Sequence, residues 1–286
     1  MAEGARPREP DEFDRLVAQA QTVMMARPDI ALSAAQRAET IAERRTPQNR
    51  NAIATVLGIE AEALNRTNRN AEALRAVTKA SRLAASGGHL TKLDGELAET
   101  SGFIAESAND FAFALKEYQQ AHDIFARLGN KRGQAIALLD LGDLYDKARD
   151  FAREIRYDRE AVQVYSGDPR IALGVANNLG YTYLQMRRFT EATPYLQQAL
   201  GIAATLRSPV LEATILDNLA FSYAGAHNLA EAERAADRSL MLVSKSDPDG
   251  EARFAWMVKA EIEYRRGALD EAVADLQKSF RGVDLK

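Results

Sequence analysis

The chain has 286 residues, 46% of them hydrophobic, and its 41 acidic and 37 basic side chains leave a formal net charge of −4. This near balance provides no general attraction to nucleic acid or to an anionic membrane surface. Cysteine is absent, which excludes disulfides, thiolate metal sites and cysteine nucleophiles but suits the cytosol and the periplasm alike. No stretch approaches the ~18 apolar residues of a membrane-spanning helix. We therefore expect a soluble cytoplasmic or periplasmic segment without nucleic-acid partners or direct membrane insertion.

The chain opens with a short segment, residues 1–10, of small, charged and proline residues. This composition predicts a disordered lead, and the end left by a removed export signal would look the same. Apolar side chains at helical spacing then flank Arg27-Pro28-Asp29, within residues 11–46. They predict a degenerate helical hairpin that caps the repeats following it.

A small residue recurs through the rest of the chain about every 40 residues. The series is Ala61, Gly102, Gly142, Gly180, Ala220 and Ala260. Further small residues follow twelve and nineteen positions later in nearly every repeat. A fixed period of this length without strand patterning is typical of stacked helical arrays, in which no single unit can bury its own apolar face.

Each repeat reads as a helix, a polar turn and a second helix, because apolar residues recur at helical spacing on both sides of the turn. The expected fold is all-α: a single right-handed α-solenoid, or superhelix, of about seven hairpins over residues 11–286. The expected units span 11–46, 47–88, 89–130, 131–167, 168–207, 208–246 and 247–282. Capping side chains before proline mark several unit starts, at Thr46-Pro47, Asp168-Pro169, Ser208-Pro209 and Asp247-Pro248.

The recurring small residues have a mechanical interpretation. Where two helices cross closely, only glycine, alanine or serine lets the backbones approach. Glu154 is the exception, because it occupies one of these positions. A shifted register or a pairing with Arg156 or Arg159 would each explain it, and the sequence leaves both open.

In the middle of the chain several positions match one repeat signature at once, a Leu-Gly pair, a tyrosine, an aromatic residue and two alanines. The best matches are Leu141-Gly142 with Tyr145, and Leu179-Gly180 with Tyr183, Phe189, Ala192 and Ala199. In these residues the chain resembles the tetratricopeptide repeat (TPR) family. Its unit of about 40 residues, longer than the usual ~34, resembles a subclass found in kinesin light chain and in sensory regions of bacterial signalling proteins. HEAT-like units share the length but lack the Leu-Gly and tyrosine signature.

The resemblance implies that the first helices of successive hairpins line a concave groove, with positions 2, 5, 6, 9, 12 and 13 of each unit facing inward. When the recurring small residue is numbered position 8, positions 5, 6 and 9 hold carboxylates, amides and aromatic rings in the central units. The expected groove residues are Glu99, Phe103, Asp140, Asp143, Asn177, Asn178, Tyr181, Asp217, Asn218 and Phe221.

Each group within this set has a ligand-binding and a structural interpretation. Asn178 and Asn218 offer amides suited to the backbone of an extended peptide, or they bridge neighbouring helices. The aromatic residues are expected as anchors for a partner, or as core residues if the register is off by one position. The carboxylates favour a basic partner segment, or form an ordinary solvated face.

Residues for chemical catalysis are not recognisable. The histidines His89, His122 and His227 lie in different repeats without metal-ligand spacing. No phosphate-binding loop ending in Gly-Lys-Ser/Thr and no nucleophile elbow occurs. We therefore expect no enzymatic activity, no bound metal and no cofactor.

Together these patterns predict a non-catalytic module that captures a protein or an extended peptide, with a basic segment as the favoured partner. In one alternative the chain is the N-terminal sensory or dimerisation region of a longer, membrane-anchored bacterial signalling protein, such as a diguanylate cyclase or histidine kinase. The final hairpin lacks a capping helix before Lys286, which motivates that alternative. In another, the chain is a structural self-assembly module that forms a homodimer through its terminal helices.

Overall fold

The computed structural model describes residues 11–45, 49–243 and 252–280. The contacts divide the chain into two compact units, Met1–Leu144 and Tyr145–Lys286, and each is described by itself. The expected lead, residues 1–10, and the start signals at Thr46-Pro47 and Asp247-Pro248 lie outside the described residues. A single continuous right-handed solenoid over both units stays a prediction.

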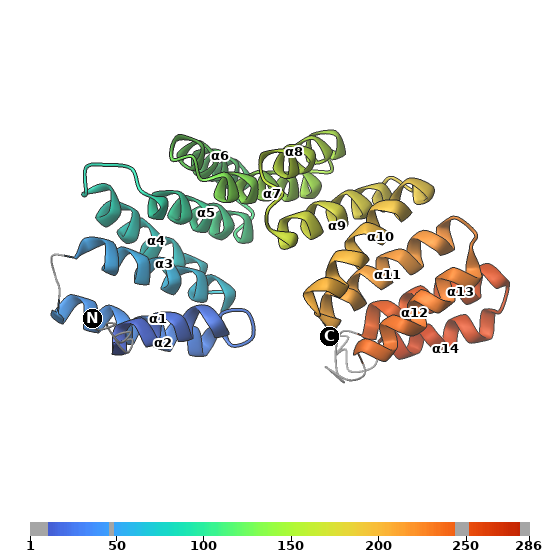
Figure 1. Ribbon diagram of the computed structural model, residues 1–286. Helices are drawn as coiled ribbons and strands as arrows, with labels where there is room; N and C mark the ends of the chain where they lie inside the picture. The colour runs from blue at the N-terminus through green and yellow to red at the C-terminus, as the bar shows by residue number, and fades with distance from the viewer. Residues whose placement is uncertain (1–10, 46–48, 244–251, 281–286) are drawn as a thin grey trace, which may run out of the picture. The chain divides into compact units, whose positions relative to one another are not determined.

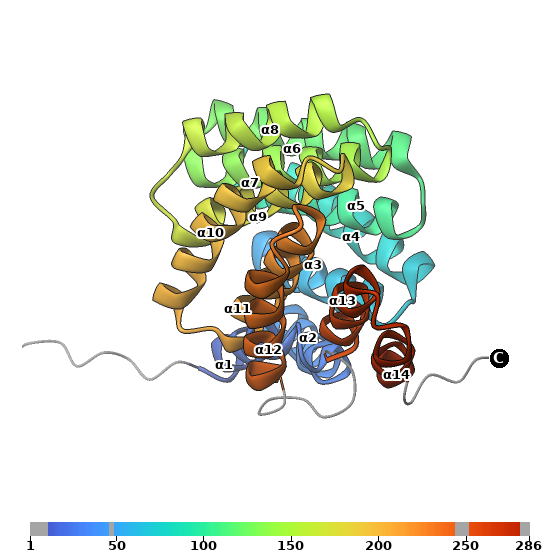
Figure 2. The same ribbon diagram turned by 90° about the vertical axis from the view of Figure 1, so that its right-hand side faces the viewer.

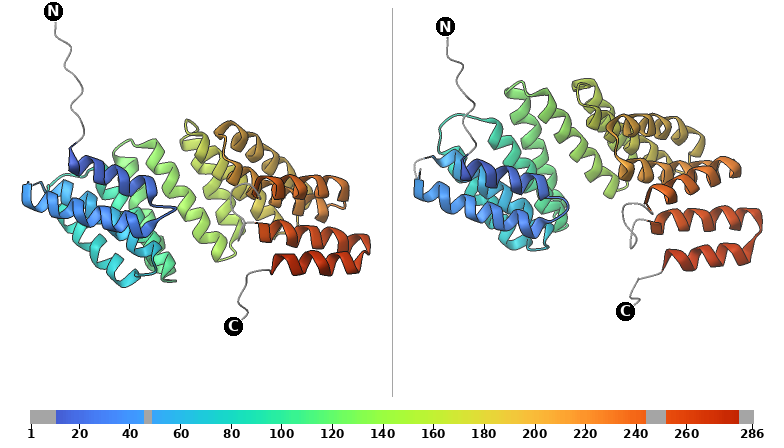
Figure 3. Two further views of the ribbon diagram at one scale, coloured as in Figure 1. Left: turned by 90° about the horizontal axis from the view of Figure 1, so that it is seen from below. Right: turned by 60° about the horizontal axis from the view of Figure 1, so that its bottom comes forward.

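Unit 1 is built from helical hairpins (Figure 1). Its helices are α1 (Glu12–Val23), α2 (Pro28–Arg45), α3 (Arg50–Arg66), α4 (Asn70–Ala85), α5 (Lys92–Ser107), α6 (Phe111–Arg127) and, up to Leu144, α7 (Lys131–Lys147). Each helix packs on the next from α1 to α6, and the first helices α1, α3 and α5 also contact one another in series. Figure 3 shows the blue α1–α2 hairpin at the N-terminal end of this stack.

Unit 2 repeats the same arrangement. Its helices are α8 (Phe151–Val164), α9 (Pro169–Gln185), α10 (Phe189–Leu206), α11 (Pro209–Gly225), α12 (Leu229–Val243), α13 (Ala252–Arg266) and α14 (Leu269–Ser279), preceded by the last turn of α7. The first helices α9, α11 and α13 lie side by side, and α13 with α14 forms the last hairpin (Figure 2). The described residues contain helices and no strand, so the predicted all-α, stacked-hairpin fold class is confirmed.

The recurring small residues lie where the helices of a hairpin meet. A Cβ atom built on Gly102 would be 2.6 Å from ring atoms of Tyr118, and one on Gly180 would be 2.6 Å from Leu196. Real Cβ atoms do not approach this closely, so the large partner side chain occupies the space that glycine leaves. The alanines twelve residues later are equally inaccessible, since Ala114 and Ala192 are fully buried.

Glu154 is buried within this pattern, with 2% of its surface exposed. The hydroxyl of Thr182, on the first helix of the next hairpin, donates a hydrogen bond to Glu154 Oε1. The exception is therefore a polar contact between consecutive hairpins in the expected register, and the alternative of a shifted register was wrong.

The turns inside the six hairpins from α3–α4 to α13–α14 share one geometry. Residues with positive φ follow the first helix in successive hairpins, namely Asn68, Asn109, Arg149, Arg187, His227 and Gly267. The next residue donates its backbone N–H to a carbonyl five positions earlier, as Arg188 does to Tyr183 O at 2.8 Å. This left-handed helix ending satisfies carbonyl groups that the helix would otherwise leave unpaired.

Side-chain caps begin the helices at several of the predicted start signals. The Asp168 carboxylate accepts from the backbone N–H of Arg170 at 2.9 Å, and Ser208 Oγ accepts from that of Leu211 at 3.4 Å. Each precedes a proline at the first helical position, where the missing N–H costs nothing. The sequence signals at Asp168-Pro169 and Ser208-Pro209 are thus helix starts in the structure.

Candidate functional site

In unit 2 the adjacent helices α9 and α11 bring several expected groove residues together. Asn177 and Tyr181 come from α9, and Asp217 and Asn218 come from α11. The Asn218 side chain donates Nδ2–H to Asn177 Oδ1 at 3.3 Å. Two carboxamides from consecutive hairpins are therefore joined on this surface.

Two adjoining cavities open beside this amide pair. The first, which we call the carboxyl cavity, has a volume of about 430 Å³ and is lined by Asn177, Tyr181, Val210, Ala213, Thr214, Asp217, Asn218, Val243 and Phe254. The second, the apolar cavity, has a volume of about 350 Å³ and is lined by Tyr181, Leu184, Gln185, Asn218, Phe221, Phe254, Met257, Val258 and Glu261. They share Tyr181, Asn218 and Phe254, so one ligand can occupy both.

Asp217 is the charged group of the carboxyl cavity, and it is 6% exposed. Burial raises its pKa to about 7, while a hydrogen bond with Ser239 lowers it. Its Oδ1 atom accepts no hydrogen bond from the described residues. A buried carboxylate oxygen without a donor is costly, and a cationic group in the cavity would satisfy it.

Large exposed side chains form the walls around these polar groups. Tyr181, Phe254 and Met257 are 43%, 42% and 43% exposed. Aromatic and methionine side chains exposed at a cavity are suited to a partner's apolar or cationic side chain. Tyr181 was expected here from the sequence; Phe254 was missed, although it lies at position 2 of its unit and a count at that position would have found it.

The other two expected residues of unit 2 have structural contacts. Phe221 is half-buried, lines the apolar cavity and makes an edge contact with Phe189 at 6.0 Å between ring centroids. Asn178 does not line either cavity, and its backbone carbonyl accepts from the Thr182 hydroxyl at 2.8 Å. The structure thus hydrogen-bonds Asn218 to Asn177 at position 5, whereas the sequence matched Asn218 with Asn178, which holds the same position 6 in the preceding unit.

In unit 1 the expected carboxylates gather on α5 and α7. Glu99 and Asp140 are half-buried, and Asp143 is exposed. Burial, with a smaller contribution from Glu96, raises the pKa of Glu99 to about 8. Burial together with Glu99, Asp143 and Glu106 also holds the pKa of Asp140 well above its ordinary value. This face is therefore less negative at neutral pH than its residue count indicates.

The aromatic side chains beside these carboxylates already contact other side chains of their own unit. Tyr118 donates its hydroxyl proton to Glu106 Oε2 at 2.6 Å. The expected anchor Phe103 is half-buried, with the Arg66 guanidinium 5.3 Å from its ring centroid. One face of Phe103 is thus covered by a side chain of its own unit.

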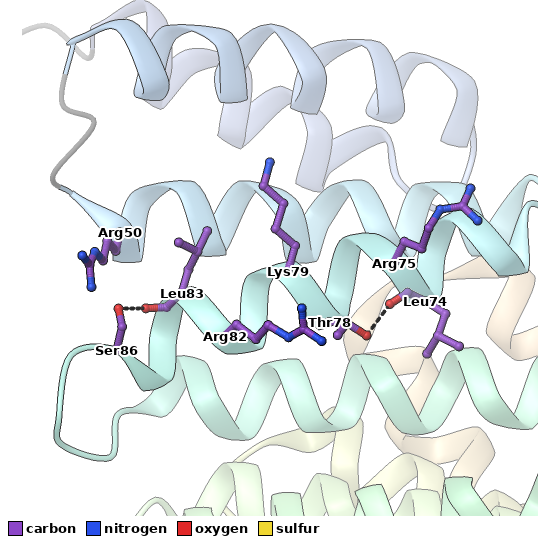
Figure 4. Close-up of a pocket in the computed structure, with 8 residues that line it drawn as sticks. All are labelled: Arg50, Leu74, Arg75, Thr78, Lys79, Arg82, Leu83 and Ser86. Atoms are coloured by element: carbon purple, nitrogen blue, oxygen red, sulfur yellow. Dashed lines mark hydrogen bonds between the residues drawn. The ribbon is translucent and has the colours of Figure 1, made fainter.

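A basic groove lies along α4 (Figure 4). Its volume is about 540 Å³, and its lining residues are Arg50, Leu74, Arg75, Thr78, Lys79, Arg82, Leu83 and Ser86. This surface was not predicted from the sequence, because the predicted groove residues all lie on the first helices of the hairpins.

Over residues 11–45, 49–243 and 252–280, no three or more acidic or histidine side chains are placed to hold a metal ion. No helix in the same ranges is both long and apolar enough to cross a bilayer.

The fold defines a helical-repeat protein built from stacked hairpins. Residues 172–245, from α9 into the segment after α12, match the family model described as tetratricopeptide repeat. The predicted resemblance is confirmed: this segment carries tetratricopeptide repeats, and the fold of the chain is that of TPR proteins. The match coincides with the part of the sequence where the repeat signature is most complete.

Solved structures with this fold include several TPR proteins. A signal transduction ATPase with a tetratricopeptide repeat sensor from Pyrococcus horikoshii is 17% identical, with a TM-score of 0.73, and the match covers 93% of this chain but only 41% of that one. The apo form of RapI is 12% identical with a TM-score of 0.74, covering 94% and 76% of the two chains. A Rap protein complexed with competence and sporulation factor is 17% identical with a TM-score of 0.63 and the same coverages. No curated protein matches the chain.

Proposed function

We propose that this chain is a non-catalytic module that binds an extended peptide segment of a partner protein on the α9–α11–α13 surface of unit 2. The observation that carries the proposal is the carboxyl cavity, where a buried carboxyl, two carboxamides and two exposed aromatic rings converge. TPR proteins of the same fold have been solved with a sensor role or with a bound factor, which supports a binding function.

The polar groups of the cavity fit a peptide backbone. Asn177 and Asn218 present an amide donor and an amide acceptor on adjacent helices. A carboxamide pairs with both the N–H and the C=O of an extended chain, whatever its side chains are. These two residues would therefore hold the ligand without selecting its sequence.

The two cavities would select which side chains the bound peptide carries. The unsatisfied Oδ1 of Asp217 favours a lysine or arginine side chain of the peptide, which the rings of Tyr181 and Phe254 would flank. An apolar side chain nearby on the peptide would enter the apolar cavity against Met257 and Phe221. The ligand class is thus a basic segment with a neighbouring apolar anchor.

The test uses a fluorescent peptide array in which a central lysine is replaced in turn by norleucine, glutamine and glutamate. The wild-type chain should prefer lysine, and Asp217→Asn should reduce that preference by roughly tenfold or more, because a hydrogen bond to a charged group contributes about 1.5–3 kcal/mol. Equal binding of the lysine and norleucine peptides by the wild-type chain would contradict the proposal.

The amide contribution is tested with a matched pair of substitutions on α9. Asn177→Ala should weaken binding of the lysine peptide several-fold, whereas Asn178→Ala, one residue away and outside both cavities, should not. Circular dichroism of both variants checks that the helices remain. If Asn178→Ala alone weakened binding, the ligand contact would belong to Asn178, as the sequence predicted, and not to Asn177.

Self-association is a second candidate function, favoured by one surface. Four apolar side chains on one face of α14 are 43–59% exposed, namely Leu269, Val273, Leu276 and Phe280. Contiguous exposed apolar surface often marks a contact between proteins. Light scattering over a concentration series tests whether this face joins two copies, and Val273→Glu should then return the chain to a monomer.

Placement within a longer signalling protein is the remaining candidate. The chain spans 41% of the signal transduction ATPase whose repeats form a sensor. A sensory role for this chain would also require the binding surface proposed above. The peptide experiment therefore tests the peptide-binding proposal and the sensory proposal together. Sequencing the gene beyond the codon for Lys286 would test it directly.

A further inference from the structure

The basic groove on α4, which we call the α4 groove, lies apart from the peptide site and belongs to unit 1. Six of its eight lining residues lie on one side of α4, Ser86 directly follows the helix, and Arg50 joins them from the start of α3 (Figure 4). The groove therefore follows the helix for about three turns.

The cations of this groove are mostly unpaired. Lys79 is the exception, since its Nζ lies 2.8 Å from Glu39 and 3.7 Å from Glu43 on α2, and the hydrogen bond to Glu39 raises its pKa. Arg50, Arg75 and Arg82 make no ion pair with any described residue. The positive charge of this surface is thus offset at Lys79 and left unpaired at the three arginines.

The acidic residue nearest in sequence is hydrogen-bonded to an arginine outside the groove, and Arg75 makes only the smallest of the contributions that lower its pKa. Glu72, the sole carboxylate of α4, accepts from Nε and from an NH₂ group of Arg69 at 2.8 and 2.7 Å. No carboxylate lines the groove. The patch is positive, whereas the net charge of the whole chain is negative, so the patch cannot be inferred from the composition.

The uncharged residues of the groove indicate which chemical class of ligand it can bind. The hydroxyl of Thr78 donates to Leu74 O at 2.7 Å, and that of Ser86 donates to Leu83 O at 2.6 Å, so both protons are used within the helix. The arginines are then the main donors to a ligand. Leu74, which is exposed, adds an apolar surface beside them.

The spacing of the arginines favours a row of anionic groups. Arg75 and Arg82 are seven residues apart, two helical turns, or about 10 Å along the axis. Carboxylates seven residues apart on a facing helix have the same separation. Side chains on one face of an extended strand are about 7 or 13 Å apart and match less well. A single phosphate group would instead need cations that converge on one point.

We infer that the α4 groove binds an acidic amphipathic helix of a partner protein, whose carboxylates pair with Arg75 and Arg82 and whose apolar side chains lie against Leu74 and Leu83. This second interaction surface is independent of the peptide site proposed in unit 2. A chain with both surfaces would connect a basic segment on one unit with an acidic helix on the other.

The test is fluorescence anisotropy with a labelled helical peptide that carries leucines and glutamates two turns apart on one face. The full chain should bind it, and Arg75→Gln with Arg82→Gln should weaken binding roughly tenfold, because each exposed ion pair contributes up to about 1 kcal/mol. The matched control is Arg15→Gln with Arg127→Gln, which removes two exposed arginines of unit 1 outside the groove and should leave binding unchanged.

Four outcomes would overturn the inference. Equal weakening by the control pair, or equal binding of an isomer peptide with its glutamates spread around the helix, would show non-specific charge attraction. Tighter binding to phosphatidylserine vesicles than to the peptide would assign the groove to a membrane surface, and complete displacement of the peptide by millimolar inorganic phosphate would assign it to a single anion. Binding of the lysine peptide to unit 2 should be the same in both double variants as in the wild type, which separates this test from that of the peptide site.

Discussion

Asn218 on α11 donates its side-chain amide to Asn177 Oδ1 on α9 at 3.3 Å, so two consecutive hairpins are joined by a carboxamide pair at the edge of the carboxyl cavity. The bond uses one acceptor and one donor and leaves the other amide positions available to a ligand. We expect a double-mutant cycle with Asn177→Ala and Asn218→Ala to give a coupling free energy of about 0.5–1 kcal/mol in urea unfolding. Strict additivity would show that the bond does not form in solution.

The stability of unit 2 should depend on pH through Asp217. Its pKa in the folded chain is about 7, raised by burial from an ordinary 3.8. The folded state therefore keeps a proton that the unfolded chain has released, and the free energy of unfolding falls as pH rises from about 4 to about 7. In Asp217→Asn this decrease in the free energy of unfolding should be absent, because asparagine does not titrate.

The measurement is thermal unfolding of wild type and Asp217→Asn at two pH values. At pH 8 the variant should be more stable by a few kcal/mol at most, since a pKa unit corresponds to about 1.4 kcal/mol. At about pH 3, where the carboxyl of Asp217 is protonated in both the folded and the unfolded chain, the two should melt together. A destabilised variant at pH 8 would mean that an ionic contact holds Asp217 in the folded chain.

Two glycines in helices should respond in opposite directions to alanine. At Gly102 the new Cβ would overlap the Tyr118 ring, so Gly102→Ala should destabilise unit 1 by about 1–3 kcal/mol. At Gly201, on α10, nothing lies within 4 Å of the new atom, so Gly201→Ala should stabilise the chain by about 0.5–1 kcal/mol through helix propensity. Urea unfolding of both variants checks the contrast, and equal effects would contradict the close helix crossing.

The recurring left-handed turn predicts a stabilising substitution at Arg187. This residue has φ of 58° and is exposed, in a conformation that glycine adopts without strain. Arg187→Gly should therefore raise the free energy of unfolding by about 0.5–1 kcal/mol. Arg170→Gly, in the first turn of α9, is the control and should lower it.

Much of the fold was predictable because it depends on local spacing. Gly102 and Gly180 mark hairpin crossings through their distance from the next repeat, and Asp168-Pro169 marks a helix start through its own chemistry. Both signals act over a few turns of chain. Glu154 was recognisable as an exception, but its partner Thr182 lies 28 residues away on another hairpin and has no sequence signature.

The candidate site was predicted only in part. The sequence indicated Asn177, Tyr181, Asp217, Asn218 and Phe221 as one face of the first helices, and all five line the two cavities of unit 2. The α4 groove was missed, because unpaired cations become visible only when the position of every carboxylate is known.

What the sequence by itself determined is the repeat, the hairpins and the set of side chains on each helix face, since all of these follow from the period of about 3.6 residues per turn. Only the tertiary structure decided that Asn177 meets Asn218, and that Asp217 is buried with an oxygen that accepts no hydrogen bond from the described residues. The physical reason is that neighbouring residues differ by about 100° around a helix, so the packing of one hairpin against the next selects which of them meets its neighbour.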